Sequence, residues 1–383
     1  MKYQSVAILG AGAVGSYVMW GLAKKKEIDL CVVASGERKA RYERDGFVIN
    51  GQVYHPVVRT PEEAAGVELL IVATKYQALR PALGDIQTVA GEHTTVMSLM
   101  NGARVAISGQ AIGIAEAAYR EARKYAAERM QFKKSIDQFP AIYDMLAGMK
   151  VKLTAARALL YETTRVVDLR NGYTHLVEHG ENVSADDRAK QKYYNKVAAV
   201  LTPMCKALAT EMANQVAYDA IQIHGGTGFM KDFNAERFYR DARITNIYEG
   251  TTQLQVVAAI GGVIQRDNDV RIQELASLDY TGKLARLRDT VMKLHARQLE
   301  AVKFVAEKKD PAYHDLMARS LVEMETYIFV GLLLLRDAMK CEDRAAIAER
   351  FILDAVPEFE KRFMRVTSGD VTLIDNKRDI IDY

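Results

Sequence analysis

The hydrophobic and polar residues follow two different patterns along the chain. Up to about residue 102, short apolar runs alternate with more polar stretches, and each run lies next to Gly, Ser, Lys or Thr. Apolar runs separated by helical stretches are typical of the buried parallel strands of a βαβ sheet. The strands predicted in this way are 5–9, 30–34 and 67–73, with a helix at 16–25 after the first of them.

From Arg104 onward the pattern changes, because apolar residues recur every three or four positions in stretches rich in Ala, Leu, Glu, Lys and Arg. This spacing predicts helix almost throughout. We expect connections at Asn171-Gly172 and at Glu178–Asn182, and a break between two helices at Lys309-Asp310-Pro311. The predicted helices are 104–130, 139–171, 185–221, 250–265, 271–308, 312–340 and 343–365.

The two patterns predict a multidomain protein, in which an N-terminal α/β Rossmann-like domain is followed by an all-α helical bundle. A length of 383 residues agrees, since domains usually have about 100–200 residues. The first 102 residues also hold 11 of the 25 glycines and three of the seven prolines, as expected for short elements joined by turns. With 49% hydrophobic and 26% charged residues, the chain does not have the composition of a disordered protein.

Charge, apolar runs and cysteines exclude several classes of function. The net charge of +3 is spread evenly, because residues 1–102 carry 11 Lys and Arg against 10 Asp and Glu; a nucleic-acid partner would require a clustered basic face. The run Ile328–Leu335 is much shorter than the about 20 residues of a membrane span, and the N-terminus lacks the pattern of a signal peptide. Three widely spaced cysteines indicate reduced thiols, no metal site and a cytoplasmic location.

A glycine motif at the N-terminus indicates a nucleotide site. Gly10, Gly12 and Gly15 form G-x-G-x-x-G between a predicted strand and a predicted helix. The first glycine permits a tight turn, the second lets the backbone approach a pyrophosphate, and the third allows close helix–strand packing. The second strand ends without an acidic residue, and Ser35 and Arg38 follow it, which favours NADP over NAD. The alternatives are a glycine turn without a ligand and a solvated basic start of the next helix.

The first hundred residues resemble the N-terminal domain of the ketopantoate reductases (2-dehydropantoate 2-reductases). The matching features are the glycine motif, the run 41–47, the segment 73–77 and the tripeptide 100–102. The resemblance implies that Lys75 and Asn101 lie beside the nicotinamide and the substrate, where a lysine steadies a carboxylate or a carbonyl oxygen. The alternative is a surface lysine after a strand. The second, helical domain of that family does not follow Gly102.

Residues 104–383 resemble a different family, the acyl-CoA dehydrogenases. They are similar to the C-terminal helical domain of these flavoenzymes, in particular of larger members with an extra helical tail, such as the 3-methylmercaptopropionyl-CoA dehydrogenases. The matching segments are 104–113, 125–132, 222–229 and 240–251. The junction at 100–104 fits the patterns of both families, as recombination at a short shared sequence, an assembly error or design would leave it.

This second resemblance implies FAD as cofactor and an acyl-CoA substrate. Glu249 takes the position of the carboxylate that removes the proton α to the thioester while the flavin accepts the β hydride, and such a base is expected in a water-poor pocket. Thr251 and Gln253 take the positions that contact the adenosine end of FAD. The positions that contact the FAD of a neighbouring subunit are Arg129, Gln131, Phe132, Gln222, Gly225 and Gly226, so a homo-oligomer is implied.

Two departures and several ordinary alternatives accompany this interpretation. Lys133 and Ser135 stand where the family commonly has Gly and Pro, and the two domains that usually precede this one are replaced by the nucleotide-binding part, so we expect poor turnover. In the alternative interpretation, Glu249 is a surface glutamate, Arg129 forms a surface salt bridge and the two glycines only end a helix.

Three hypotheses for the whole chain follow. The first is an FAD-dependent oxidoreductase that dehydrogenates an acyl-CoA thioester between its α and β carbons, and the second is an NADPH-dependent reductase of 2-oxo acids such as ketopantoate. The third is a non-catalytic helical oligomer. The expected domains are a Rossmann-like NADP-binding domain over 1–102, an acyl-CoA dehydrogenase C-terminal-like domain over 103–268 and a helical extension over 269–383.

Overall fold

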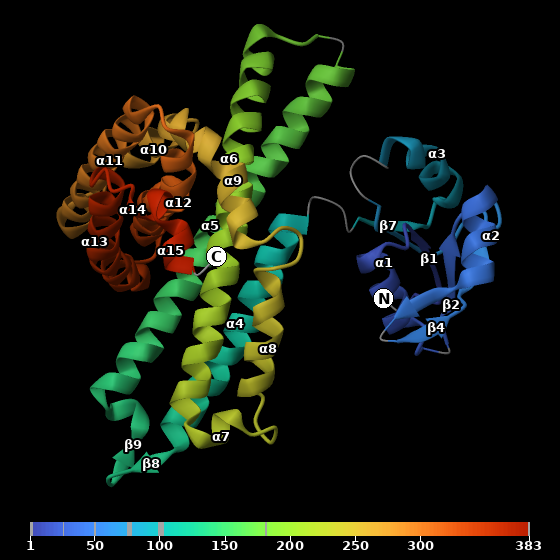
Figure 1. Cartoon of the computed structure of the whole chain (residues 1–383), viewed down its shortest axis with the longest axis horizontal. Helices are drawn as coiled ribbons and strands as arrows, with labels where there is room; N and C mark the ends of the chain where they lie inside the picture. Colours follow the sequence, from blue (N-terminus) through green and yellow to red (C-terminus); the bar gives the residue numbers. More distant parts are fainter. Residues whose placement is uncertain are drawn as a thin grey trace. The chain divides into compact units, whose positions relative to one another are not determined.

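The computed structural model describes residues 3–25, 27–49, 51–74, 79–98, 103–180 and 182–381. The chain divides into two compact units, Met1–Ala103 and Arg104–Tyr383, and each is described by itself (Figure 1). Two predicted site residues, Lys75 and Asn101, lie outside the described residues.

The first unit is built on a five-stranded sheet in which every neighbouring pair of strands is parallel. Its strands, in the spatial order β5-β2-β1-β6-β7, are Val57–Arg59, Asp29–Val33, Ser5–Leu9, Leu69–Val72 and Thr95–Ser98. The helices are α1 (Ala13–Leu22), α2 (Gly36–Asp45) and α3 (Leu79–Val89), and a small hairpin consists of β3 (Phe47–Ile49) and β4 (Gln52–Tyr54).

The strand order places the turning point of the topology at the centre of the sheet. From β1 the chain builds outward through β2 to β5, and then it crosses back to β6 on the other side of β1. The carboxyl ends of β1 and β6 therefore flank the point where a doubly wound sheet binds its ligand. The predicted Rossmann-like fold of this part is confirmed.

The three central strands were predictable because both of their faces are buried. Residues of β1 and β6 alternate between two apolar clusters, one on each face of the sheet. The edge strands β5 and β7 were not predicted, since they are short and partly polar, and Val57 and Val96 remain about half exposed. A strand with one open face lacks the continuous apolar run that marks a central parallel strand.

The second unit begins with a bundle of long helices. One face of the first helix, α4 (Ala103–Glu128), carries a stripe of completely buried alanines that lets α4 pack closely on its neighbours. The alanines of this stripe are Ala111, Ala115, Ala118, Ala122 and Ala126. The remaining helices are α5 (Pro140–His179), α6 (Ala185–His224), α7 (Gly226–Phe229), α8 (Ala235–Thr245) and α9 (Thr252–Ile264). The hairpin β8–β9 (Met130–Gln131 and Lys134–Ser135) and the short helix η2 (Ile136–Gln138) connect α4 to α5.

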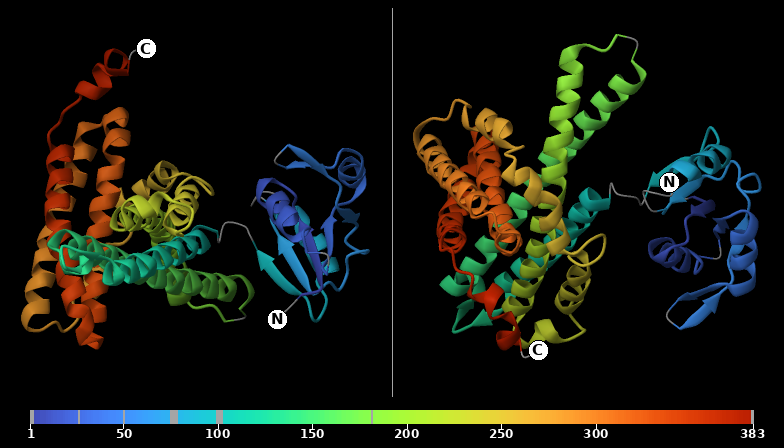
Figure 2. Two further views of the ribbon diagram at one scale, coloured as in Figure 1. Left: turned by 90° about the horizontal axis from the view of Figure 1, so that it is seen from below. Right: turned by 45° about the horizontal axis from the view of Figure 1, so that its top comes forward.

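The rest of the chain forms a C-terminal extension that packs against α5, α6 and α9 (Figure 2). At its centre lies α12, in which the apolar run Ile328–Leu335 is buried on every side. Within the described ranges, no helix is long and apolar enough to cross a membrane. The elements are α10 (Asp269–Ala276), α11 (Gly282–Lys308), α12 (Pro311–Lys340), η3 (Glu342–Arg344), α13 (Ala345–Thr367), α14 (Thr372–Asp375) and α15 (Lys377–Ile381).

Most helix boundaries agree with the predicted ones to within a few residues, and two predictions were wrong. Helix α5 continues through Asn171-Gly172, because this pair lies inside a long helix held by packing elsewhere and both of its residues are exposed. The predicted helix 271–308 is two helices, since the chain turns between Ala276 and Gly282. The break at Lys309–Pro311 is confirmed, with Asp310 accepting hydrogen bonds from the first amides of α12.

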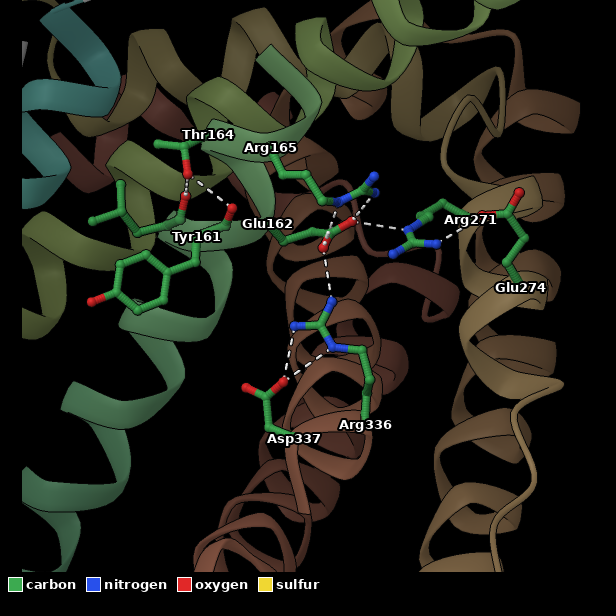
Figure 3. Close-up of polar contacts among 9 residues, drawn as sticks. Tyr161, Glu162, Thr164, Arg165, Arg271, Glu274, Arg336 and Asp337 are labelled. Atoms are coloured by element: carbon green, nitrogen blue, oxygen red, sulfur yellow. Dashed lines mark hydrogen bonds and ion pairs between the residues drawn. The ribbon is translucent and has the colours of Figure 1, made fainter. Parts of the chain in front are cut away.

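A buried carboxylate connects the extension to the bundle. Glu162 on α5 is 1% exposed and accepts hydrogen bonds from three arginines on three different helices (Figure 3). The nitrogen–oxygen distances are 2.6 Å to Arg165, 2.9 Å to Arg271 on α10 and 2.8 Å to Arg336 on α12. These arginines hold the pKa of Glu162 at about 2, although burial alone would raise it. The geometry fixes α10 and α12 against α5.

Candidate functional site

The turn between α8 and α9 has an unusual backbone. Glu249 has φ +54° and Gly250 has φ +91°, so two consecutive residues take the left-handed region. Glycine adopts this conformation readily, but a glutamate rarely does, and such residues persist only where the surroundings hold them. Glu249 is half-buried in this turn, less enclosed than the water-poor pocket that was expected.

A buried lysine holds the turn from below. The side chain of Lys206 on α6 is completely buried, and its Nζ donates to the carbonyl oxygens of Tyr248, at 2.7 Å, and of Gly250. Burial, and then the charge of Arg104, lower the pKa of Lys206 to about 8, although the charge of Glu249 acts in the opposite direction. The lysine therefore binds the backbone carbonyl groups on both sides of Glu249. The sequence analysis missed it, although a lone lysine in the apolar run Val200–Ala209 was an available signal.

Further contacts fix both ends of the turn. Gln255 donates to the carbonyl oxygen of Gly250 at 2.9 Å, and a Cβ at Gly250 would lie only 2.7 Å from the same amide nitrogen. Tyr248 donates its hydroxyl to the side chain of Gln110 on α4. Burial, and then the charge of Glu249, raise the pKa of Tyr248. Residues from α4, α6 and α9 thus meet around the backbone of this turn.

Thr251 and Gln253 begin the helix that follows the turn. The Thr251 hydroxyl caps α9 by accepting from the amide of Leu254 at 3.4 Å, a long contact that leaves the hydroxyl exposed. Gln253 is exposed and lines a cavity of about 390 Å³ together with residues of α12 and α13. The structure therefore brings Glu249, Thr251 and Gln253 together on one short segment.

The second set of predicted flavin contacts begins where α4 ends. Arg129, Gln131 and Phe132 are exposed, Phe132 by 83%, and Arg129 has no ion-pair partner among the described residues. Phe132 and Lys133 form the turn of the β8–β9 hairpin with φ +47° and +66°. The tight turn therefore forms with Lys133 in the position where the family commonly has glycine.

Gln222, Gly225 and Gly226 lie where α6 ends and α7 begins (Figure 1), and Thr227 of α7 donates to the hydroxyl of Tyr125 near the end of α4 at 3.2 Å. His224 fixes them, because it is buried, stacks on Tyr125 at 4.3 Å between ring centroids and bonds the carbonyl oxygen of Ala220. This geometry gives His224 a structural role. Gly225 ends α6 at φ +62°.

The two sets of residues lie far apart in one chain. Gln222 comes 16 residues after Lys206 on α6, which corresponds to about 24 Å at 1.5 Å per residue. The turn with Glu249 lies at the level of Lys206. The residues after the end of α4, Arg129, Gln131 and Phe132 (the Arg129 set), lie at the level of Gln222. One chain therefore presents two separate surfaces.

In the first unit, the glycine motif has the expected geometry. Gly10 has φ +99°, and a Cβ there would lie 2.8 Å from the backbone of Ala73 and Thr74. A Cβ at Gly15 would lie 1.9 Å from the Gly10 carbonyl oxygen, so only glycine lets α1 pack this closely. Around Gly12, by contrast, no atom of the described residues lies within 4 Å of an added Cβ, which leaves room for a ligand to approach the backbone there.

Ser35 and Arg38 lie at the carboxyl end of β2, on the same edge of the sheet as this motif. Both side chains are exposed, and no described residue pairs with Arg38. Ser35 precedes α2 without capping it. Hydroxyl and guanidinium groups free of protein partners fit a phosphate. No group of three or more His, Cys, Asp or Glu side chains suited to a metal occurs in the described part of the chain.

Comparison with protein families divides the chain in the same manner. The ketopantoate reductase PanE/ApbA model matches residues 6–115, the model of the acyl-CoA dehydrogenase C-terminal domain matches 93–260, and a second acyl-CoA dehydrogenase C-terminal model matches 269–368. The helical part is of the acyl-CoA dehydrogenase type. The first two matches overlap over 93–115, around the junction that fits both families.

Curated relatives match less than half of the chain. The chain is 38% identical over 171 residues to a 3-(aryl)acrylate reductase of Clostridium sporogenes, which covers 45% of the chain and 39% of the relative. It is 39% identical to an acryloyl-CoA reductase (NADH) of Anaerotignum propionicum (44% and 37%) and 35% identical to a 3-methylmercaptopropionyl-CoA dehydrogenase of Ruegeria pomeroyi (47% and 30%). The match thus spans about two fifths of the first of these relatives, and less of the others.

Solved structures agree in fold over a longer stretch. An acyl-CoA dehydrogenase from Bacillus anthracis, solved with FAD, has a TM-score of 0.55 at 23% identity and covers 69% of this chain and 48% of its own. The Caenorhabditis elegans protein ACDH-11, solved with C11-CoA, has a TM-score of 0.56 at 21% identity and covers 66% and 42%. The predicted fold of the helical part, with its extension, is confirmed.

Proposed function

We propose that the helical unit acts as an FAD-dependent oxidoreductase on acyl-CoA thioesters, with Glu249 as the base. The observation that carries this proposal is the left-handed turn at Glu249, which Lys206 holds through the carbonyl groups on both sides. A backbone held in a rare conformation by a completely buried cation is typical of a side chain that must be aimed. The similarity to acyl-CoA dehydrogenases over 93–260 includes this turn.

The role of Glu249 in this proposal is to take the proton α to the thioester carbonyl. FAD, when bound, would accept the hydride from the β carbon. The turn supports the role of the carboxylate because its backbone is fixed by contacts to α6 and α9, so only the side chain has to adjust to the substrate. We choose acyl-CoA thioesters as the substrate class because similar proteins are named for such substrates.

The residues that would hold FAD fit a dinucleotide in kind and position. Thr251 offers an exposed hydroxyl, and Gln253 offers an exposed amide at the rim of a cavity that contains several cationic side chains. The Arg129 set would contact the FAD of a neighbouring copy, because it lies about 24 Å away from the Glu249 turn along α6. We therefore propose a homo-oligomer, in which each copy completes the site of another.

The test is flavin retention and turnover by the full chain. The protein would be mixed with FAD, passed through gel filtration, and assayed for oxidation of acyl-CoA thioesters with an artificial electron acceptor. The proposal predicts retained flavin, turnover, and an oligomer by light scattering. Loss of all flavin together with absence of turnover would contradict it. A colourless oligomer would instead favour the non-catalytic alternative, to which the exposed Phe132 and Phe229 would contribute association surface.

A second candidate function rests on the first unit. We propose that Gly10, Gly12 and Gly15 bind NADPH, with Ser35 and Arg38 at the extra phosphate, and that Lys75 and Asn101 serve reduction of a 2-oxo acid. The open backbone at Gly12, next to two tightly packed glycines, supports this proposal. Oxidation of NADPH in the presence of ketopantoate tests it, and a rate no higher than in buffer would count against it.

All three cysteines are unpaired, which supports a cytoplasmic location.

A further inference from the structure

The cavity beside Gln253 is lined mostly by charged residues of the C-terminal extension. It has a volume of about 390 Å³, within the range of small-molecule sites. We propose that this cavity binds the phosphate-bearing part of a nucleotide, and that the extension thereby supplies a binding site for FAD. The choice of FAD rests on the proposed function. The charged lining residues are Asp315, Arg319, Glu323, Lys361, Arg362 and Arg365.

The charges of the lining favour a phosphate group. Four cationic side chains face two carboxylates, so the lining has an excess of two positive charges. Lys361 and Arg365 are one helical turn apart on α13, where like charges repel. Both are exposed, and neither has an ion-pair partner among the described residues. Since Arg362 also pairs with Glu358, outside this lining, the cations left without a carboxylate are Lys361 and Arg365, and these two charges suit the two negative charges of a pyrophosphate.

The two inner arginines are already oriented. Glu323 bridges them, because its carboxylate accepts from Nε of Arg319 at 2.8 Å and from Nε of Arg362 at 2.5 Å. Glu358 accepts from the terminal nitrogen of Arg362 at 2.5 Å. Arg319 keeps its two terminal nitrogens without a protein acceptor in the described structure, and a guanidinium held through Nε offers these as a fork to phosphate oxygens.

A neighbouring cavity has room for the rest of a nucleotide. It has a volume of about 550 Å³, and Arg319, Glu323 and Arg362 belong to the lining of both cavities. Its lining includes the apolar side chains of Leu208, Val256 and Val322, and Thr252 from the turn region. An apolar wall beside a cationic cluster suits an adenine ring joined to a phosphate. Gln253, which the proposed function places at the adenosine end of FAD, lines the cationic side.

The experiment compares two double variants of the full chain by calorimetric titration. Lys361→Gln with Arg365→Gln removes the two unpaired cations of the cavity. Arg286→Gln with Lys293→Gln is the matched control, because both residues are exposed cations on α11 that lie outside the cavity and have no ion-pair partner among the described residues. Far-ultraviolet circular dichroism verifies that both variants keep their helices. The probes are FAD, ADP and CoA.

The proposal predicts that the wild type and the control bind FAD and ADP alike, and that the cavity variant binds both at least about tenfold more weakly, since charged hydrogen bonds are lost. If the cavity variant loses affinity for CoA but not for FAD or ADP, the cavity is a phosphate site for CoA, and its assignment to FAD is wrong. Unchanged affinity of the cavity variant for all three probes, or no binding by the wild type, would overturn the proposal. ADP binding that depends on the cavity, in a protein without acyl-CoA turnover, would support the site while the proposed function fails.

Discussion

Replacing Glu162 by glutamine tests how the extension is held to the bundle. The carboxylate is the common acceptor of Arg165, Arg271 and Arg336, which come from three helices (Figure 3). The arginines lower the pKa of Glu162 from 4.5 to about 2. This shift corresponds to about 3 kcal/mol of stability near neutral pH, since each pKa unit is worth about 1.4 kcal/mol.

The dependence on pH has a definite sign. A carboxyl group with a depressed pKa in the folded state stabilises the protein above its unfolded pKa, and this stability is lost as the pH falls through the folded value. The free energy of unfolding of the wild type should therefore exceed that of Glu162→Gln by about 3 kcal/mol near pH 7 and by only about 1 kcal/mol near pH 3. The loss falls in the window between 4.5 and about 2.

Urea unfolding followed by far-ultraviolet circular dichroism measures this difference in the helical unit. The single tryptophan, Trp20, lies in the first unit, so its fluorescence reports on that unit separately. Glu274→Gln is the matched control, because Glu274 pairs with Arg271 at 2.8 Å but is half exposed, and it should cost less than about 1 kcal/mol. A difference for Glu162→Gln that is the same at both pH values would refute the reasoning.

Three further predictions concern other sites. Glu325 is buried, and burial raises its pKa to about 7. The wild type should therefore lose up to about 3 kcal/mol of unfolding free energy relative to Glu325→Gln as the pH rises from 4.5 through 7. Urea unfolding at a series of pH values measures this loss. Gly15→Ala should unfold the first unit, whereas Gly12→Ala should stay folded and bind NADPH at least about tenfold more weakly, as tryptophan fluorescence and titration would show. Lys206→Met should cost about 1–3 kcal/mol of stability but reduce acyl-CoA turnover far more, because the Glu249 turn is released; equal effects on stability and turnover would contradict this.

The sequence predicted those parts of the fold whose residues carry a strong local pattern. The strand Ser5–Leu9 and the break at Asp310 are examples, since one is a continuous apolar run after a polar start and the other combines a capping side chain with a proline. The pair Asn171-Gly172 misled, because turn-forming residues are tolerated inside a helix that tertiary contacts hold. Strands at a sheet edge carry too short a pattern to be found.

Of the candidate site, the sequence supplied the residues that face outward and missed those beneath them. Glu249, Thr251 and Gln253 belong to one segment, so a local motif reveals them together. Lys206 reaches the same turn from 43 positions upstream of Glu249, and only the packing of α6 beneath the turn brings it there. The cationic cavity combines α9, α12 and α13 in the same way, and no local pattern connects those helices.

The measurement that tests the central proposal most directly is an anaerobic titration of the flavin-loaded full chain with an acyl-CoA thioester. If Glu249 is the base, the visible flavin absorption of the wild type should bleach. Glu249→Gln should retain its flavin and stay coloured, while Glu300→Gln, an exposed glutamate on α11, should behave like the wild type. A Glu249→Gln protein that bleaches as fast as the wild type would contradict the role assigned to this turn.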